Sequence, residues 1–171
     1  TMGNGITLSM TNNNDTKIID TSTSFRKIKF LRLDDPPTFS QGLQGTWDNV
    51  LAINEIQMFV GGINIIPTLE DSRFTSSTYN ETNINPPTGY YPKNVKSQGF
   101  AFDTSNLWHS ASTDDRPEII VDLSTDYKLN DIQSIIVYNQ YLSSHARADR
   151  AQSINGCALQ LLDVNDDIIY Q

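Results

Sequence analysis

Few residues in this chain could carry out catalysis. It has two histidines, His109 and His145, so a Ser-His-Asp or metal-histidine arrangement has few members to draw on. Gly61 and Gly62 lie between two expected strands and do not open a helix, so they do not form a phosphate-binding loop. Carboxylates that could pair for acid–base work are scattered: Asp114, Asp115, Asp122 and Asp126. We therefore expect a chain that binds a ligand and is not an enzyme.

A long polar segment, residues 68–107, is broken by prolines and glycines, and we expect it to be a loop that carries function. Tyrosines and asparagines within it could form a recognition surface, because tyrosine offers contact area at low entropic cost and asparagine adapts its hydrogen bonds. The alternative is that this loop packs on the rest of the domain. The residues concerned are Tyr79, Tyr90, Tyr91, Asn80, Asn83 and Asn85.

Charge and length narrow the class of protein. The formal net charge of -8 argues against nonspecific binding of nucleic acid or anionic membrane, and it is compatible with a cation site made of carboxylates. A length of 171 residues suits one domain with a real core.

Cys157 is the only cysteine, so no intrachain disulfide can form, and its strand-like surroundings favour a buried thiol over a nucleophile. We expect neither a membrane helix nor a signal peptide.

Short alternating runs bounded by turn residues recur along the chain, and helical spacing is nearly absent. Several short strands without crossover helices predict an all-β fold, an antiparallel β-sandwich of the jelly-roll type. We expect residues 1–24 to be a flexible arm and residues 25–171 to be a single domain. The strands expected are 25–33, with Ile28, Phe30 and Leu33 on one face, then 53–60, 63–66, 117–123, 132–138 and 158–162, and a hairpin over 162–169.

Five runs stand in a characteristic order: SSTY at 76–79, AFDTSNLWHS at 101–110, PEIIVDL at 117–123, IIVYN at 135–139 and NGCALQLLD at 155–163. In this order they resemble the discoidin superfamily, which is galactose-binding-like. That superfamily includes coagulation-factor C-type domains, fucose-binding F-type lectins and sugar-binding modules appended to glycosidases. The resemblance covers residues 53 to 171.

The resemblance implies a structural calcium ion, held by an Asp loop, backbone carbonyls and a Glu from the closing strand of the family domain. Calcium suits such a site because it accepts roughly six to eight oxygen ligands in flexible geometry. The alternative is an Asx-type turn over 103–106, whose side chains bond their own backbone. Thr104 and Phe100 stand where the family often has Gly and Asn. The candidate metal ligands are Asp103, Ser105, Asn106 and Glu55.

The resemblance also implies a sugar site. F-type lectins use a His after the Asp loop, matched here by His109, and an Arg-x-Asp-x4-Arg run, of which Arg147 keeps the residue type. Gln140 and Leu142 occupy the run's other positions. A sugar site needs planar donors for hydroxyl pairs and an aromatic face. The candidate ligand-binding residues are His109, Arg147, Gln140, Arg150, Trp108 and Tyr141.

Each part of this sugar site has a structural alternative. Trp108 could be a core aromatic residue, and His109 could be a hydrogen-bonded structural histidine. The segment 144–150 could be a solvated charged loop. These alternatives stay open at the level of the sequence.

The order of segments differs from that of the family. A run similar to 53–59 usually closes the family domain, and 25–33 resembles its penultimate strand, yet both come first here. We therefore hypothesise a circularly permuted module in which residues 25–60 supply the closing strands, because sandwich termini lie close together. The alternative is that residues 25–60 are the tail of a preceding module and that the chain is truncated.

The combined expectation is a non-catalytic, lectin-like module that binds a glycan or glycoprotein with loops at one end of a β-sandwich. It would be extracellular or on a virion surface, and a homo-oligomer is compatible with this function. Neither nucleic acid nor membrane insertion is expected. The alternative is a structural or assembly module of a larger particle or fibre, because Asn-rich, cysteine-poor discoidin-like domains resemble those of virion proteins of large DNA viruses.

Overall fold

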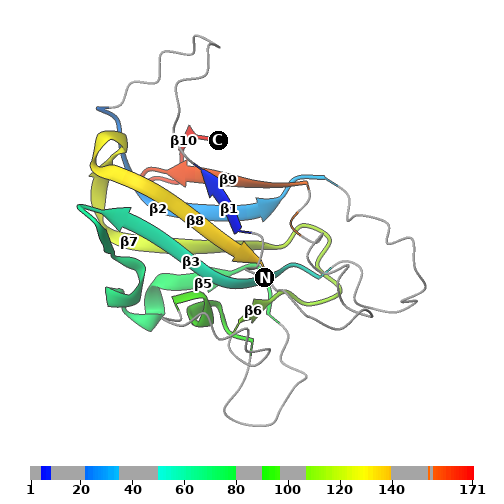
Figure 1. The fold of residues 1–171 in the computed structure, drawn as a ribbon. Helices are drawn as coiled ribbons and strands as arrows, with labels where there is room; N and C mark the ends of the chain where they lie inside the picture. Colours follow the sequence, from blue (N-terminus) through cyan, green and yellow to red (C-terminus); the bar gives the residue numbers. More distant parts are fainter. Residues whose placement is uncertain are drawn as a thin grey trace.

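A computed structural model describes residues 5–8, 22–34, 50–79, 90–96, 107–139, 154 and 156–171, and for 5–8 it describes the backbone alone. These residues form an antiparallel β-sandwich of two five-stranded sheets, which confirms the predicted fold class (Figure 1). Within the described ranges, no helix is long and apolar enough to cross a membrane. The helices described are short 3-10 turns: η1 (Ile66–Thr68), η2 (Asp71–Arg73), η3 (Pro92–Lys96) and η4 (Leu129–Asp131).

The two sheets are built from strands that are far apart in the chain. The first sheet runs β1 (Gly5–Leu8), β8 (Ile132–Asn139), β3 (Ala52–Val60), β4 (Ile63–Asn64), with β6 (Trp108–His109) also paired to β3. The second runs β10 (Ile168–Tyr170), β9 (Cys157–Leu162), β2 (Ser24–Arg32), β7 (Glu118–Lys128), β5 (Phe74–Ser76). Figure 1 shows the sheets as two facing layers.

The core lies between these layers, because each strand turns alternate side chains inward. On β2 the inward residues Ile28 and Phe30 are buried, while Lys27 and Lys29 on the other face are partly exposed. Phe25 is also buried, because the β2–β7 register shifts between Phe25 and Lys27. The largest fully buried side chains are Trp108, Arg32, Phe25, Ile28, Leu51, Ile53, Ile56, Met58, Ile66, Leu107, Ile119 and Leu123.

Two details of the strand predictions were wrong. The expected strand over 63–66 ends at Asn64, because the Asn64 Oδ1 accepts hydrogen bonds from the backbone N–H of Met58 (3.2 Å) and Ile66 (3.3 Å) and turns the chain into η1. Leu33 does not share the inward face of Ile28 and Phe30. Arg32 does, at 1% exposure, whereas Leu33 is 41% exposed.

Segments expected to lack strands contain short ones. Residues 5–8, within the expected arm, form β1 and pair with β8. The expected loop over 68–107 contains η2, β5 and η3. β5 pairs with β7 and buries Phe74, which lies opposite Val121. Strands of three or four residues carry too little alternation to stand out in a sequence.

The N-terminal strands are fully integrated into the sandwich. β2 lies between β7 and β9, and β3 lies between β8 and β4. An unpaired β2 would have contradicted the permutation hypothesis, and β2 is instead paired on both sides. The hypothesis itself remains a prediction.

Candidate functional site

Three strand ends of the first sheet meet at one end of the sandwich. Ile53 of β3 is in register with Asn139 of β8 on one side and with Trp108 of β6 on the other. Ala52 lies opposite His109. We call the region around these five residues the β6 end. In Figure 1 the β6 label marks it, close to where the β8 arrow ends.

The segments that carry the predicted ligands join the sheet at the β6 end. Residues 103–106 lie just before Leu107 and Trp108 in the sequence, and residues 140–150 follow Asn139. Most candidate residues themselves lie outside the described part of the chain: Asp103, Ser105, Asn106, Gln140, Tyr141, Arg147 and Arg150. The structure places the other three, Glu55, Trp108 and His109.

Trp108 is fully buried, at 0% exposure, and belongs to the hydrophobic core. Its indole Nε1 donates a hydrogen bond to the carbonyl oxygen of Thr78 at 3.1 Å. This is the core position that the sequence left open as an alternative. In this structure Trp108 offers no surface on which a sugar ring could stack.

His109 is also buried, at 1% exposure. The carbonyl oxygen of Ser110 accepts a hydrogen bond from its Nδ1 at 3.0 Å. Its ring also contacts the ring of Tyr90, with the two centroids 5.0 Å apart at an interplanar angle of 31°. His109 therefore has the surroundings of the hydrogen-bonded structural alternative.

Glu55 is a buried carboxylate, at 4% exposure, next to an irregularity in the pairing of β3 with β8. Its Oε1 accepts a hydrogen bond from the side-chain amide of Gln57 at 2.8 Å. Burial raises the pKa of Glu55, and the Gln57 bond offsets this only in part. Tyr138 lies opposite Glu55 on β8, and its pKa is raised by burial and by the Glu55 charge.

A buried carboxylate is a suitable oxygen ligand for a cation. The other predicted ligands, at 103–106, lie outside the described residues. Among the residues that are described, no group of three or more His, Cys, Asp or Glu side chains could hold a metal ion. Glu55 is thus the one predicted metal ligand that lies within the described residues.

Two tyrosines of the 68–107 segment form an exposed aromatic pair. Tyr79 is 36% exposed and Tyr91 is 41% exposed. Their ring centroids lie 5.4 Å apart at an interplanar angle of 51°. Tyr90, the third predicted tyrosine, turns the other way and packs on His109. The predicted partners Asn80, Asn83 and Asn85 lie outside the described residues.

Sequence reasoning missed several buried polar residues near this end, among them Arg32 and Asn139. Arg32 Nη2 donates to the carbonyl oxygen of Val50 at 3.4 Å and so links the end of β2 to the residue before Leu51 and β3. Strict alternation from Ile28 and Phe30 would have found Arg32 on the inward face. Asn139 gave no such signal, because a polar residue at a strand end is ordinary.

Cys157 pairs with Arg32 in the β2–β9 ladder. Burial raises the pKa of the Cys157 thiol to about 11, and the Arg32 guanidinium lowers it only in part. Little thiolate therefore exists near neutral pH, which disfavours a nucleophilic role for this cysteine.

The candidate site is therefore the β6 end. It contains the buried polar residues Glu55, His109 and Asn139, and the exposed Tyr79–Tyr91 pair lies beside it. The assignment depends on this geometry alone. The chain matches no protein-family model, no curated protein and no solved structure.

Proposed function

We propose that this protein is a non-catalytic carbohydrate-binding module that holds its ligand at the β6 end of the sandwich. One observation carries the proposal: β3, β6 and β8 meet there, so the segment that bears Asp103 and the segment that bears Arg147 attach to the same end of one sheet. Loops held by a rigid sandwich are common sites of recognition. The convergence brings together segments separated by more than 30 residues in the sequence.

Two of the described residues that could do acid–base or covalent chemistry, His109 and Cys157, are poorly placed for it. His109 is buried against Tyr90 and Ser110, and the Cys157 thiol has a raised pKa. A catalytic base must reach its substrate, and a catalytic thiol must ionise near the working pH. These surroundings favour binding over catalysis.

The ligand chemistry follows from charge. With a net charge of -8, the protein repels polyanions, so a neutral ligand rich in hydroxyl groups is favoured. Arg147 would supply a planar fork of donors to adjacent hydroxyls. Exposed tyrosines near the same end would supply aromatic faces.

A structural calcium ion fits the surroundings of Glu55. A cation would offset the cost of burying this carboxylate in its charged form. Trp108 pairs with Ile53, two positions before Glu55, and Asn106 is two positions before Trp108 in the sequence. Asp103, Ser105 and Asn106 would complete the ligand set, and the ion would hold their segment in place.

The test is an array of defined neutral oligosaccharides, probed with the whole chain in calcium and again in EDTA. We expect saturable binding to one class of glycan, weaker in EDTA. Arg147→Ala should reduce the affinity for that glycan by at least about tenfold, as loss of a charged donor pair would. The matched control is Arg73→Ala, which removes an arginine that pairs with Asp122 on the outer face of the second sheet.

Two results would contradict the carbohydrate-binding proposal. One is a folded protein that binds no glycan on the array. The other is an Arg147→Ala variant with the affinity of the parent for a confirmed glycan. Absence of glycan binding together with a defined oligomer in light scattering would instead support the assembly alternative.

A further inference from the structure

We propose that Tyr79 and Tyr91 form a sugar-stacking platform and that Trp108 and His109 hold this platform in place. The platform rests on the carbohydrate-binding function proposed above. It assigns the aromatic contact to two tyrosines that the lectin resemblance did not mark, and it gives Trp108 and His109 a positioning role.

The platform has the geometry of a stacking surface. Both rings are exposed and touch one another, with centroids 5.4 Å apart and a tilt of 51°. The negative face of an aromatic ring attracts the C–H groups on the apolar face of a pyranose. Because the two rings are tilted, they present two faces at an angle, which suits a ligand of at least two sugar rings.

Trp108 fixes the residue before Tyr79. Its Nε1 donates to the carbonyl oxygen of Thr78 at 3.1 Å. The Thr78 hydroxyl donates to Asp114 Oδ2 at 2.6 Å and accepts from the backbone N–H of Ala111 at 3.1 Å. Ser76 Oγ also donates to the Thr78 carbonyl oxygen, at 2.8 Å. Thr78, which precedes Tyr79, is therefore held by four hydrogen bonds, two at its carbonyl oxygen and two at its hydroxyl.

The next residue of β6, His109, fixes the residue before Tyr91. The rings of His109 and Tyr90 lie 5.0 Å apart between centroids. On the other side, the carbonyl oxygen of Tyr91 accepts from the backbone N–H of Asn94 at 3.0 Å. The Asn94 side-chain amide in turn donates to the carbonyl oxygen of Leu107 at 3.1 Å.

Three consecutive residues, 107–109, thus hold both tyrosines. Held in place before the ligand arrives, the rings lose little conformational entropy on binding. A buried pair on β6 can therefore determine affinity without touching the ligand. This explains how residues at 0% and 1% exposure can belong to a binding site.

Charge distinguishes a sugar from the other common ligand of exposed aromatic rings, single-stranded nucleic acid. Nucleic-acid binding requires a cationic groove, whereas this chain carries a net charge of -8. The lysines nearest to Tyr91 in η3, Lys93 and Lys96, both pair with Asp71. The platform therefore favours a neutral ligand.

The experiment uses the oligosaccharide that binds the parent chain most strongly on the neutral-oligosaccharide array, titrated by calorimetry. Tyr79→Ala and Tyr91→Ala should each weaken its binding by roughly tenfold. Tyr79→Phe and Tyr91→Phe keep the ring and should stay within about twofold of the parent. Ile63→Ala, which truncates a 65% exposed apolar side chain on β4, is the control and should leave binding unchanged.

Parent-like affinity in both alanine variants would overturn the platform. If Arg147→Ala still weakens binding by at least about tenfold in that case, the proposed carbohydrate function survives and only the platform fails. A parent chain that binds no oligosaccharide would overturn both proposals. Both tyrosines lie at the surface, so the alanine variants should stay folded, and thermal unfolding of each variant checks this.

Discussion

The indole of Trp108 and the carbonyl oxygen of Thr78, 30 residues apart in the chain, are joined by a hydrogen bond of 3.1 Å. This bond connects the hydrophobic core to the residue that precedes an exposed tyrosine. Trp108 is therefore both a core residue and a support for the surface beside it. The two descriptions of Trp108 that the sequence offered as alternatives, core and site, are compatible in this arrangement.

Trp108→Phe tests this relationship, because phenylalanine fills most of the same volume and lacks the Nε1 donor. We expect a loss of stability of about 1–2 kcal/mol, from the lost bond and the reduced ring. When Trp108→Phe is made in the parent, the affinity for the oligosaccharide should fall several-fold. When it is made in the Tyr79→Ala variant, it should cause no further loss of affinity. Calorimetric titration of the four proteins of this double-mutant cycle measures the coupling. Equal losses in both backgrounds would show that Trp108 affects binding independently of Tyr79, and an unchanged affinity would show that Trp108 acts on folding alone.

Much of the fold follows from local sequence. The alternation of Ile28 and Phe30 predicted β2, and the runs at 117–123 and 132–138 predicted β7 and β8. Side chains that replace backbone hydrogen bonds are harder to foresee. The Asn64 side-chain oxygen ends β4 by accepting hydrogen bonds from two backbone N–H groups, and the spacing of apolar residues does not predict such a turn.

The candidate site was only partly predictable, for a different reason. Its composition was visible, since Tyr79, Tyr91, Trp108 and His109 all stood out by type. Their arrangement was not, because which tyrosine faces solvent depends on contacts made across the fold. Tyr90 and Tyr91 are neighbours in the chain, yet one packs on His109 and the other pairs with Tyr79.

Glu55→Gln separates the cost of a buried charge from its use in calcium binding. The pKa of Glu55 is raised in the folded state, so its contribution to stability is fully present below the unfolded pKa and is lost as pH rises through the folded pKa. In EDTA at neutral pH, the neutral glutamine should therefore stabilise the protein, by on the order of 1 kcal/mol. At a pH below the unfolded pKa this gain should vanish.

In calcium the parent should be more stable than Glu55→Gln, because an ion that binds only the folded parent adds stability by mass action. Thermal denaturation of parent and Glu55→Gln at acidic and neutral pH, each in EDTA and in calcium, measures both effects. Equal stabilisation of the two proteins by calcium would place the ion elsewhere. No stabilisation of either would argue against a calcium site.

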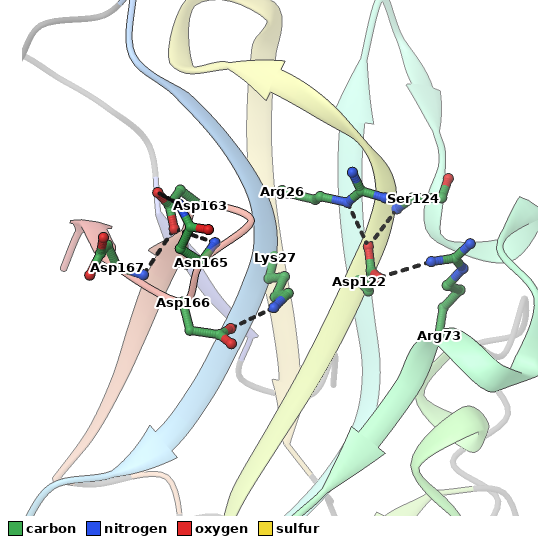
Figure 2. Close-up of polar contacts among 9 residues, drawn as sticks. All are labelled: Arg26, Lys27, Arg73, Asp122, Ser124, Asp163, Asn165, Asp166 and Asp167. Atoms are coloured by element: carbon green, nitrogen blue, oxygen red, sulfur yellow. Dashed lines mark hydrogen bonds and ion pairs between the residues drawn. The ribbon is translucent and has the colours of Figure 1, made fainter.

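Asp122 forms an ion-pair network on the outer face of the second sheet, shown in Figure 2. It accepts hydrogen bonds from Arg73 Nη1 at 2.9 Å, from Arg26 Nε at 3.4 Å and from the backbone N–H of Ser124 at 2.8 Å. Burial raises the pKa of Asp122, but the Ser124 bond and the two arginines outweigh it, and the net pKa is lowered. Asp122 therefore stabilises the fold above its unfolded pKa, and this contribution is lost as pH falls through its folded pKa.

Asp122→Asn should cost about 1 kcal/mol at neutral pH, since the pairs are partly exposed to solvent. Parent and variant should converge as the solution is acidified. Urea denaturation across acidic pH values measures the difference. The matched control is Asp166→Asn, at an ion pair with Lys27 whose carboxylate is 62% exposed, and it should change stability little. A pH-independent difference for Asp122→Asn would point to packing and not to charge.

Asp163 closes the β9–β10 hairpin through its side chain, as Figure 2 shows. Its Oδ1 accepts hydrogen bonds from the backbone N–H of Asn165 at 2.7 Å and of Asp167 at 2.9 Å. Asp163→Ala leaves both donors without this acceptor and should cost about 1 kcal/mol, comparable to the loss of a helix cap. Asp163→Asn keeps an oxygen acceptor and should recover most of the loss.

Because β10 has only three residues, its amides should exchange faster with solvent in Asp163→Ala, while those of β2 and β7 should not. Uniform acceleration across all strands would show that the turn contributes to global stability and not to the local closure of this hairpin.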